Sequence, residues 1–145
     1  DDMNGEETET VRINISDEYA NGVLKEAMVH NFDGKEVAMQ VKVGDVVLYA
    51  EYAGSDFKID GNQVGGCEVH YLSDTTAYLR WIYVNGDIVG KGIGTKCMSA
   101  LKCFLYAKGV IRFDTDTALD NRVAQHYYEK NGFIREGVTR SYYKN

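Results

Sequence analysis

The sequence predicts an α/β protein built on a mixed sheet with helices on both faces. Strand-like runs follow one another in the first half of the chain, at 46–52, 63–72 and 76–84. Short turns between them favour an antiparallel meander. A helical pattern then begins at Gly92, and a further strand-like run follows at 112–116. Two strands joined through a helix favour a parallel pair, which makes the sheet mixed.

The N-terminal part of the chain predicts a strand and a helix. Residues 1–10 are acidic, and we expect a mobile tail there. The alternation in 11–15 is typical of a half-buried strand. Ser16 or Asp17 is expected to cap a helix that ends at 30–34. The apolar face of this helix carries Val23, Leu24, Ala27 and Met28.

Two further helices are predicted in the second half. The helix that starts at Gly92 carries an apolar stripe and should pack on the sheet. Asp120 is expected to cap a second helix, which Gly132 ends. The stripe of the first helix consists of Cys97, Met98, Leu101, Phe104 and Leu105.

Length and composition favour one soluble domain over residues 1–145. The chain has 145 residues, of which 44% are hydrophobic, enough for a sizeable core. No apolar run reaches the roughly 18 residues that span a bilayer, so we expect a cytoplasmic protein without a membrane partner. The 3 cysteines have no metal-ligand spacing and are expected to be small buried hydrophobes, so no metal is predicted.

Charge is distributed unevenly along the chain. The net charge is −6, with acidic residues concentrated in the first half and basic residues in the second. The basic half would suit an anionic ligand, and the acidic half would attract cationic amines. The alternative is an unevenly charged, solvated surface. This balance excludes nucleic acid as a natural partner.

A glycine-rich segment links the strand at 76–84 to the following helix. Gly90, Gly92 and Gly94 alternate there, so consecutive backbone N–H groups can converge on a phosphate at the N-terminus of a helix. The Walker pattern does not fit, because the spacing is one residue short and no hydroxyl follows Lys91. The dinucleotide fingerprint requires a different glycine spacing. An ordinary strand-to-helix turn is the structural alternative.

A second motif follows at 120–133 and includes Asn121, Ala124, Tyr128, Gly132 and Phe133. Together with the run Val89-Gly90-Lys91-Gly92-Ile93-Gly94, it resembles the GNAT superfamily of acyl-CoA-dependent N-acetyltransferases. The resemblance covers roughly residues 76–138. One departure is Val89, which stands where the family usually has Arg or Gln.

The resemblance implies the GNAT fold, with a six- to seven-stranded sheet in which a parallel strand pair splays apart around the pantetheine of acetyl-CoA. It also implies that backbone groups near Val84 contact the cofactor and that the glycine loop grips the pyrophosphate. Asn121 would lie beside the cofactor, although it could instead cap its helix. The implied cofactor-binding residues are Tyr83, Val84, Val89, Gly90, Lys91, Gly92, Ile93, Gly94, Thr95 and Asn121.

The implied chemistry is direct attack of a neutral amine on the thioester. Tyr128 is the predicted general acid that protonates the departing thiolate, although its ring could instead belong to the apolar helix face, with Tyr127 facing the cofactor. Glu68 is the predicted base, with His70 as an alternative; the two residues share a strand face and could act together. A solvent-facing polar pair is the alternative for these two residues. Glu51 remains a candidate base, and His30 and His126 are weaker ones.

The sequence therefore predicts an acetyl-CoA-dependent N-acetyltransferase that acts on a primary amine, either a small molecule or a protein amine. A non-catalytic acyl-CoA-binding sensor or interaction module is the alternative. It is favoured by Val89 and by the lack of a carboxylate on the strand at 75–83.

Overall fold

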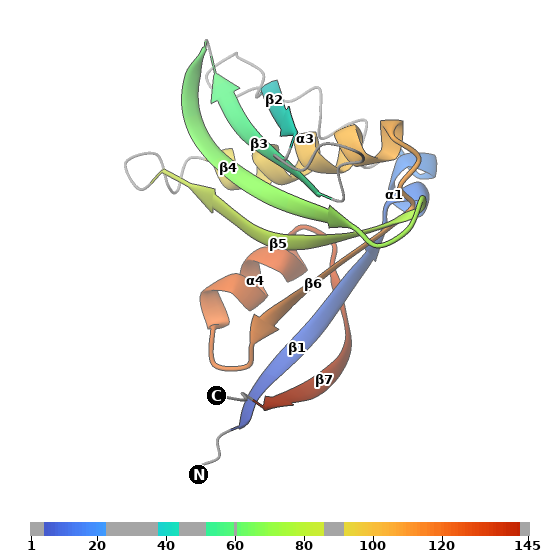
Figure 1. Ribbon diagram of the computed structural model, residues 1–145, viewed down its shortest axis with the longest axis vertical. Helices are drawn as coiled ribbons and strands as arrows, with labels where there is room; N and C mark the ends of the chain where they lie inside the picture. Colours follow the sequence, from blue (N-terminus) through green and yellow to red (C-terminus); the bar gives the residue numbers. More distant parts are fainter. Residues whose placement is uncertain (1–4, 23–37, 44–51, 60, 86–91, 143–145) are drawn as a thin grey trace.

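The protein is described by a computed structural model that covers residues 5–22, 38–43, 52–59, 61–85 and 92–142. The described elements are, in chain order, β1 (Gly5–Asn14), α1 (Ile15–Ala20), β2 (Ala38–Val43), β3 (Tyr52–Ile59), β4 (Asn62–Tyr71), β5 (Thr76–Val84), α3 (Ile93–Ala107), β6 (Arg112–Ala118), α4 (Arg122–Lys130) and β7 (Ile134–Tyr142). Figure 1 shows their arrangement.

A single mixed sheet of 7 strands has the order β2-β3-β4-β5-β6-β1-β7. The strands β2 to β5 form the predicted antiparallel meander. The strands β5 and β6 are parallel, and α3 connects them. β1 lies between β6 and β7 and pairs antiparallel with both, so the start of the described chain is in the interior of the sheet. This arrangement confirms the mixed sheet.

Several N-terminal predictions need correction or lie outside the described residues. β1 begins at Gly5, so much of the expected mobile tail is strand, because these residues pair with both β6 and β7. α1 is described only over Ile15–Ala20, and the rest of the helix expected to reach 30–34 lies outside the described residues. Of the strand predicted at 46–52 only Tyr52 is described. β3 continues from there to Ile59 through residues for which a turn was predicted, because they pair with both β2 and β4. β2 had no counterpart among the predictions.

The second half of the chain agrees more closely with prediction. β4 and β5 begin and end within one residue of the expected bounds, and α3 begins directly after Gly92. The N-cap of α4 is Asn121 and not Asp120, because the Asn121 side chain accepts a hydrogen bond from the Ala124 amide. Gly132 follows the end of α4 with φ of 95°, a conformation that favours glycine.

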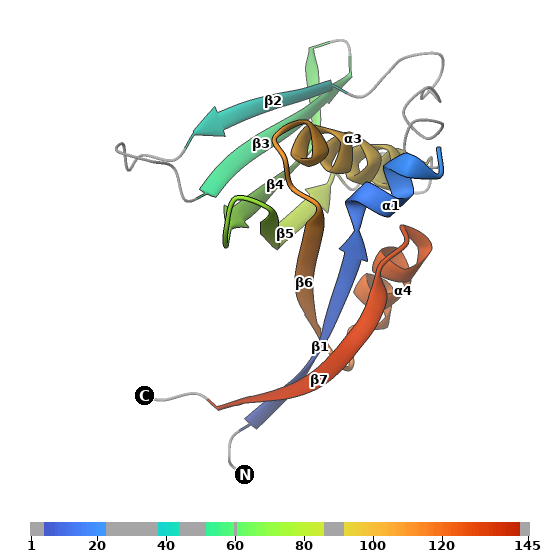
Figure 2. The same cartoon turned by 90° about the vertical axis from the view of Figure 1, so that its right-hand side faces the viewer.

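One face of the sheet carries the core. Ala77, Leu79 and Phe113 are completely buried on it, as are Val11 and Ile13 of β1 to within a few per cent. The residues between them in sequence are less buried. Packed against this face are α1, α3 and α4, which Figures 1 and 2 show on the same side of the strands. Among the described residues no helix lies on the other face, although the sequence predicted helices on both.

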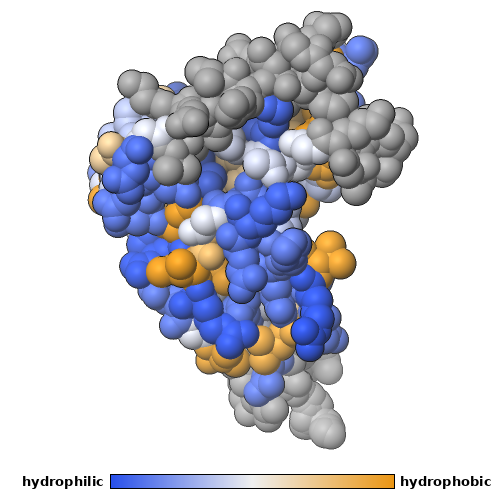
Figure 3. Space-filling view, turned by 180° about the vertical axis from the view of Figure 1, so that it is seen from behind, coloured by the Kyte–Doolittle hydropathy of each residue, from blue (hydrophilic) through white to orange (hydrophobic). Residues whose placement is uncertain are grey.

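Hydrogen bonds join the three helices to one another. Lys102 of α3 is buried, and its Nζ donates to Glu18 Oε1 of α1 at 2.9 Å and to the Asn131 carbonyl after α4 at 2.6 Å. The helix side of the molecule is largely hydrophilic at its surface (Figure 3). Cys67 and Cys97 are buried and Cys103 half-buried, all as free thiols, which confirms the expected packing role. Burial raises the pKa of the Cys97 thiol to about 12.

Candidate active site

The parallel strands β5 and β6 pair over only a short distance. Their register runs from Thr76 opposite Arg112 to Leu79 opposite Thr115, and beyond this point β5 continues to Val84 without β6. We call the point after Leu79 and Thr115 the fork. The pairing of β5 with β4 shifts there too, since Glu68 lies opposite Trp81 while Val69 lies opposite Leu79. Arg80 is therefore the extra residue of an irregularity that turns β5 away from β6.

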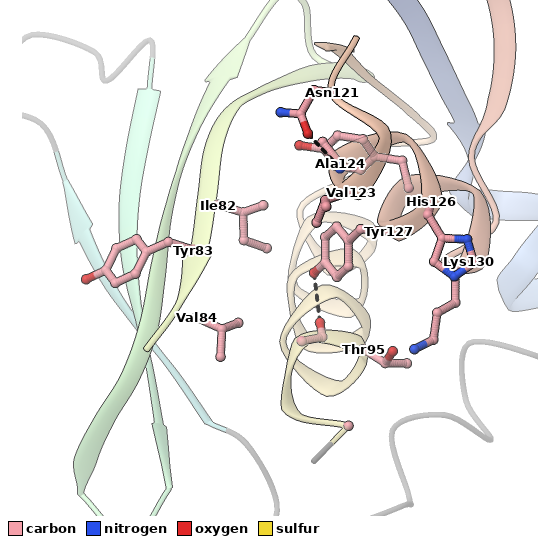
Figure 4. A pocket seen from close by; sticks show the side chains of 13 residues that line it. Ile82, Tyr83, Val84, Thr95, Asn121, Val123, Ala124, His126, Tyr127 and Lys130 are labelled. Carbon is pink, nitrogen blue, oxygen red and sulfur yellow. Dashed lines mark hydrogen bonds between the residues drawn. The ribbon is translucent and has the colours of Figure 1, made fainter. Parts of the chain in front are cut away.

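A cavity of about 590 Å³ opens beside the fork, between the free end of β5, the first turn of α3 and the helix α4. Figure 4 shows its walls. A cavity of this size lies within the usual range for small-molecule sites. Its lining residues are Ile82, Tyr83, Val84, Gly92, Gly94, Thr95, Asn121, Val123, Ala124, His126, Tyr127, Tyr128 and Lys130.

The first turn of α3 presents backbone N–H groups at this cavity. Gly92 is the N-cap with φ of 79°, and a Cβ there would meet no atom within 4 Å. No acidic residue lies in the first turn of α3, so the partial positive charge of the helix N-terminus is not offset there. Anions are favoured at such a position.

Two adjacent tyrosines of α4 have different roles at the cavity. The Tyr127 hydroxyl donates to the Gly94 carbonyl at 2.8 Å and so joins α4 to the first turn of α3. The Tyr128 side chain is 7% exposed, and its ring packs edge-on against Phe133. Burial raises the pKa of Tyr128, while a hydrogen bond with Thr115 lowers it. Burial, with the nearby Cys97 thiol next in importance, also raises the pKa of Tyr127. Both phenols are therefore neutral near pH 7.

Tyr128 lies at the fork through its contact with Thr115. The Thr115 hydroxyl donates to the Leu79 carbonyl at 2.8 Å, which spans the last paired residues of β5 and β6. The two positions considered as alternatives for Tyr128 are therefore combined: its ring is part of the hydrophobic core, and the residue also lines the cavity.

The other predicted cofactor residues fall into three groups. Tyr83, Val84, Gly92, Gly94, Thr95 and Asn121 line the cavity. Figure 4 shows the Tyr83 ring pointing away, where its hydroxyl accepts a hydrogen bond from Gln63, so Tyr83 borders the cavity mainly through its backbone. Ile93 is buried and does not line the cavity. Val89, Gly90 and Lys91 lie outside the described residues.

Glu68 is not among the residues that line the cavity. It lies on the sheet face away from the described helices, which we call the open face. His70 Nε2 lies 2.7 Å from Glu68 Oε2, and Arg80 Nε lies 3.6 Å from the same oxygen. The predicted sharing of one strand face by Glu68 and His70 is therefore confirmed, and their contact is direct.

The open face also carries a second carboxylate beside the fork. Asp116 of β6 accepts hydrogen bonds from Thr10 at 2.7 Å and from the Tyr78 hydroxyl at 3.1 Å. Sequence reasoning did not select Asp116, because only the register of β1, β5 and β6 brings these three residues together. It also missed Ile82, Val123 and Lys130 as lining residues, although the helical spacing of Val123, Tyr127 and Lys130 was a usable signal for α4.

A match to a family model identifies the family of this chain. The model of the Acetyltransferase (GNAT) family matches residues 35–133, well over half of the chain. The chain belongs to this family. The residues that line the cavity and those that form the fork lie within the matched range. In the described part of the chain no group of His, Cys, Asp or Glu could hold a metal ion, and no helix is long and apolar enough to cross a membrane.

Solved structures share the fold at low sequence identity. A conserved protein of unknown function from Staphylococcus epidermidis is 13% identical with a TM-score of 0.69, over 94% of this chain and 60% of that one. The structure of AAC(6')-Iy in complex with a CoA-containing bisubstrate analogue is 16% identical with a TM-score of 0.59, over 95% of this chain and 98% of that one. These similarities support the GNAT fold.

A short segment is similar to a different class of protein. Over 31 residues the chain is 64% identical to the co-chaperonin GroES of Clostridium botulinum. This segment is 21% of this chain, and it spans 33% of the length of the co-chaperonin. A match to a third of that protein does not carry its activity or its partners over to this chain.

Proposed function

We propose that the protein is an acetyl-CoA-dependent N-acetyltransferase that transfers the acetyl group to a primary amine by direct attack. The observation that carries this proposal is the fork. Parallel pairing ends at Leu79 and Thr115, a cavity opens beside the free end of β5, and a buried tyrosine stands at the junction. An extended acyl-CoA arm would take the position beside β5 that β6 leaves.

The proposed cofactor contacts follow the walls of the cavity. The pantetheine arm would lie along Ile82 and Val84, with free backbone groups of β5 as hydrogen-bond partners. The pyrophosphate would receive N–H groups from the first turn of α3, over Gly92, Ile93, Gly94 and Thr95. Val89, Gly90 and Lys91 remain predicted members of this loop. A solved structure that shares the fold, AAC(6')-Iy, is in complex with a CoA-containing bisubstrate analogue, which supports CoA as the ligand.

Asn121 can combine both roles considered for it. Its Oδ1 atom accepts the Ala124 amide and caps α4. The same side chain lines the cavity, so its Nδ2 group can donate toward the cofactor.

The chemistry requires two proton transfers. The amine nitrogen forms a bond to the thioester carbonyl carbon, and the carbon–sulfur bond then breaks. Tyr128, whose raised pKa keeps it protonated, would give its proton to the departing thiolate. The proton of the amine would reach Glu68 through water, because Glu68 does not line the cavity. His70, which contacts the Glu68 carboxylate, would assist Glu68 in accepting it. Much of the remaining rate enhancement comes from proximity.

Asp116 is a second candidate base that the geometry supports. It borders the fork on the open face, whereas Glu68 is one strand further away on β4. The variants Glu68→Gln and Asp116→Asn distinguish which of the two carboxylates acts as the base. The variant of the true base should lower kcat/KM most above the acidic limb of the pH profile and flatten that limb, and the other variant should leave the limb unchanged.

The alternative function is a non-catalytic acyl-CoA-binding module. It is favoured by Val89 in place of Arg or Gln and by the absence of a carboxylate from β5. Binding and turnover separate the two functions. Calorimetric titration with acetyl-CoA, with CoA and ATP as comparison ligands, tests the cofactor site. Release of free CoA thiol with a panel of primary amines then tests catalysis. Binding without turnover would support the module, and no binding would refute both functions.

A pair of glycines at the two ends of α3 provides a matched test of the cofactor position. Gly92 and Gly109 have φ of 79° and 97°, so alanine is strained at either position. Only Gly92 lines the cavity. Gly92→Ala should weaken acetyl-CoA binding, and Gly109→Ala should cost comparable stability without that loss. Equal binding by the two variants would refute the position of the pyrophosphate.

A further inference from the structure

The free half of β5 carries two aromatic side chains that the proposed chemistry does not use. Trp81 and Tyr83 are 43% and 45% exposed, and their ring centroids lie 5.8 Å apart with 33° between the ring planes. They alternate along β5 with Ile82 and Val84, which line the cavity. Trp81 lies opposite Glu68 in the register, and Figure 4 shows the Tyr83 ring pointing away from the cavity. The two rings, which we call the aromatic pair, therefore lie on the open face.

The Tyr83 ring is fixed by a side chain of the neighbouring strand. Its hydroxyl accepts a hydrogen bond from Gln63 Nε2 at 3.0 Å, and the same nitrogen donates to Asp56 Oδ1 at 3.1 Å. Between Asp56 on β3 and Tyr83 on β5 the register places Gly66, which has no side chain. Gln63 thus links the ring to a carboxylate across this position. A ring held in this way loses little conformational freedom when a ligand binds to it.

Carboxylates border the open face from the fork to the aromatic pair. Glu68 lies opposite Trp81, with His70 and Arg80 as its partners. Asp116 borders the fork, and its two partners are neutral hydroxyls. Among the described residues no cation lies within ion-pair distance of Asp116. Negative charge beside exposed aromatic faces favours a cationic ligand, because both attract positive charge.

The length of β5 sets the spacing between the fork and the aromatic pair. The middle of the pair is three residues beyond Leu79, where parallel pairing ends. At about 3.3 Å per residue this is roughly 10 Å. An extended chain covers about 1.2 Å per bond, so about eight bonds would span the distance. A nitrogen at the fork and a second cation over the rings would therefore be joined by about seven methylene groups.

We propose that the acceptor is a small, extended diamine or polyamine, and that Trp81 and Tyr83 determine this specificity by holding its second, non-reacting ammonium group. One nitrogen attacks the thioester at the fork, while the other keeps its proton and lies over the rings. The inference rests on the proposed function, since it concerns the acceptor of the same reaction. Its new content is the substrate class and the two residues that select it.

The test compares two acceptors of equal length. Heptamethylenediamine has a second amine where heptylamine ends in a methyl group, and ethylenediamine is too short to reach the rings. Release of CoA thiol gives kcat/KM for each. The diamine should exceed heptylamine roughly five- to thirtyfold, the scale of two exposed cation–π contacts and well above the statistical factor of about two for its two equivalent amines. Heptylamine that reacts as well as the diamine would overturn the inference, because the rings would then hold an apolar tail.

Variants of the aromatic pair test the two residues directly. Trp81→Leu and Tyr83→Leu should each reduce the ratio of kcat/KM for the diamine to that for heptylamine by roughly two- to fivefold. Trp81→Phe keeps an aromatic face and should retain more of the ratio than Trp81→Leu. Leu72→Ala is the control, because Leu72 is exposed in the turn at the other end of β5. An unchanged ratio in both leucine variants would overturn the assignment.

Fluorescence provides a measurement of binding that is independent of turnover. Trp81 is the only tryptophan in the chain, so the emission reports on the aromatic pair itself. With CoA present in place of acetyl-CoA, heptamethylenediamine should change the emission saturably and at lower concentration than heptylamine. Equal midpoints for the two amines would contradict a cation over the rings.

Failure of this inference can be distinguished from failure of the proposed function. Transfer to heptylamine and heptamethylenediamine with equal kcat/KM would remove the diamine specificity and leave the acetyltransferase intact. No release of CoA with any amine would refute the proposed function, and the acceptor role of the aromatic pair with it.

Discussion

The two halves of β5 differ more in their partners than in their residues. From Thr76 to Leu79 the strand pairs with β4 on one side and β6 on the other, and Ala77 and Leu79 are fully buried. From Arg80 to Val84 it pairs only with β4, and Trp81 and Tyr83 are 43% and 45% exposed. Both halves have the aromatic and branched residues typical of strands. The loss of one partner strand therefore turns a core strand into one wall of a binding site.

The largest expected effect tests the residue at the junction of the two halves. Tyr128→Phe should lower kcat by roughly 10²–10⁴-fold, the usual loss for a general acid, with little change in acetyl-CoA affinity. Steady-state kinetics and calorimetry measure the two quantities. Tyr127→Phe is the neighbouring control, because its hydroxyl binds the Gly94 carbonyl and its loss should affect affinity more than kcat. An unchanged kcat in Tyr128→Phe would leave Tyr128 with a packing role only.

A second prediction concerns the position of the free half. Gly65 of β4 lies opposite Val84, and a Cβ there would come within 2.3 Å of the Tyr83 carbonyl oxygen. Gly65→Ala should lower the free energy of unfolding by roughly 1–3 kcal/mol, because backbone must move to accommodate the methyl group. Gly137→Ala in β7 is the control, since a Cβ there meets nothing within 4 Å. Urea unfolding measures both, and equal stabilities would contradict the close approach.

A smaller effect is expected at the last paired residues. Thr115→Val removes the hydroxyl that donates to the Leu79 carbonyl, while its shape is kept. The loss of this buried hydrogen bond should cost about 1 kcal/mol of unfolding free energy and should lower kcat modestly through the contact with Tyr128. Thr117→Val, two residues further along β6, is the comparison. If Thr117→Val lowered kcat as much as Thr115→Val does, the hydrogen bond at the fork would have no specific role in catalysis.

The smallest effect is a pH dependence of stability from the open face. Burial, and then the Asp116 charge, raise the pKa of Tyr78 to about 12 from the ordinary tyrosine value of 10.0. Below pH 10 both the folded and the unfolded states keep this proton. Above it the unfolded state loses the proton first, so stability should fall as pH rises toward 12. Tyr78→Phe should show a shallower fall in urea unfolding between pH 9 and pH 11. The slope should be modest, because Tyr78 is only half-buried. A slope identical to that of the wild type would contradict the shifted pKa.

Much of the second half of the fold could be predicted from local pattern. The bounds of β5, α3 and the end of α4 follow from signals that a few adjacent residues carry, namely alternation, helical spacing and glycine at a positive φ. The first half was harder, because β1 owes its length to strands more than a hundred residues away in the sequence. Asp120 and Asn121 are both good caps, and only the observed hydrogen bond to Ala124 distinguishes them.

By itself the sequence determined the family motifs and the glycine-bordered helix N-terminus, and the family spacing from Asn121 predicted Tyr128 rather than Tyr127 as the general acid. Only the tertiary structure decided where the pairing of β5 and β6 stops, that Thr115 and Tyr128 meet there, and that Asp116 accompanies Tyr78 on the open face. It also decided that His126 and Lys130 lie with Thr95 at one side of the cavity, opposite Ile82 and Val84. The physical reason is that spacing along a helix or strand reports which side a residue occupies, whereas strand register and helix packing determine what lies opposite it.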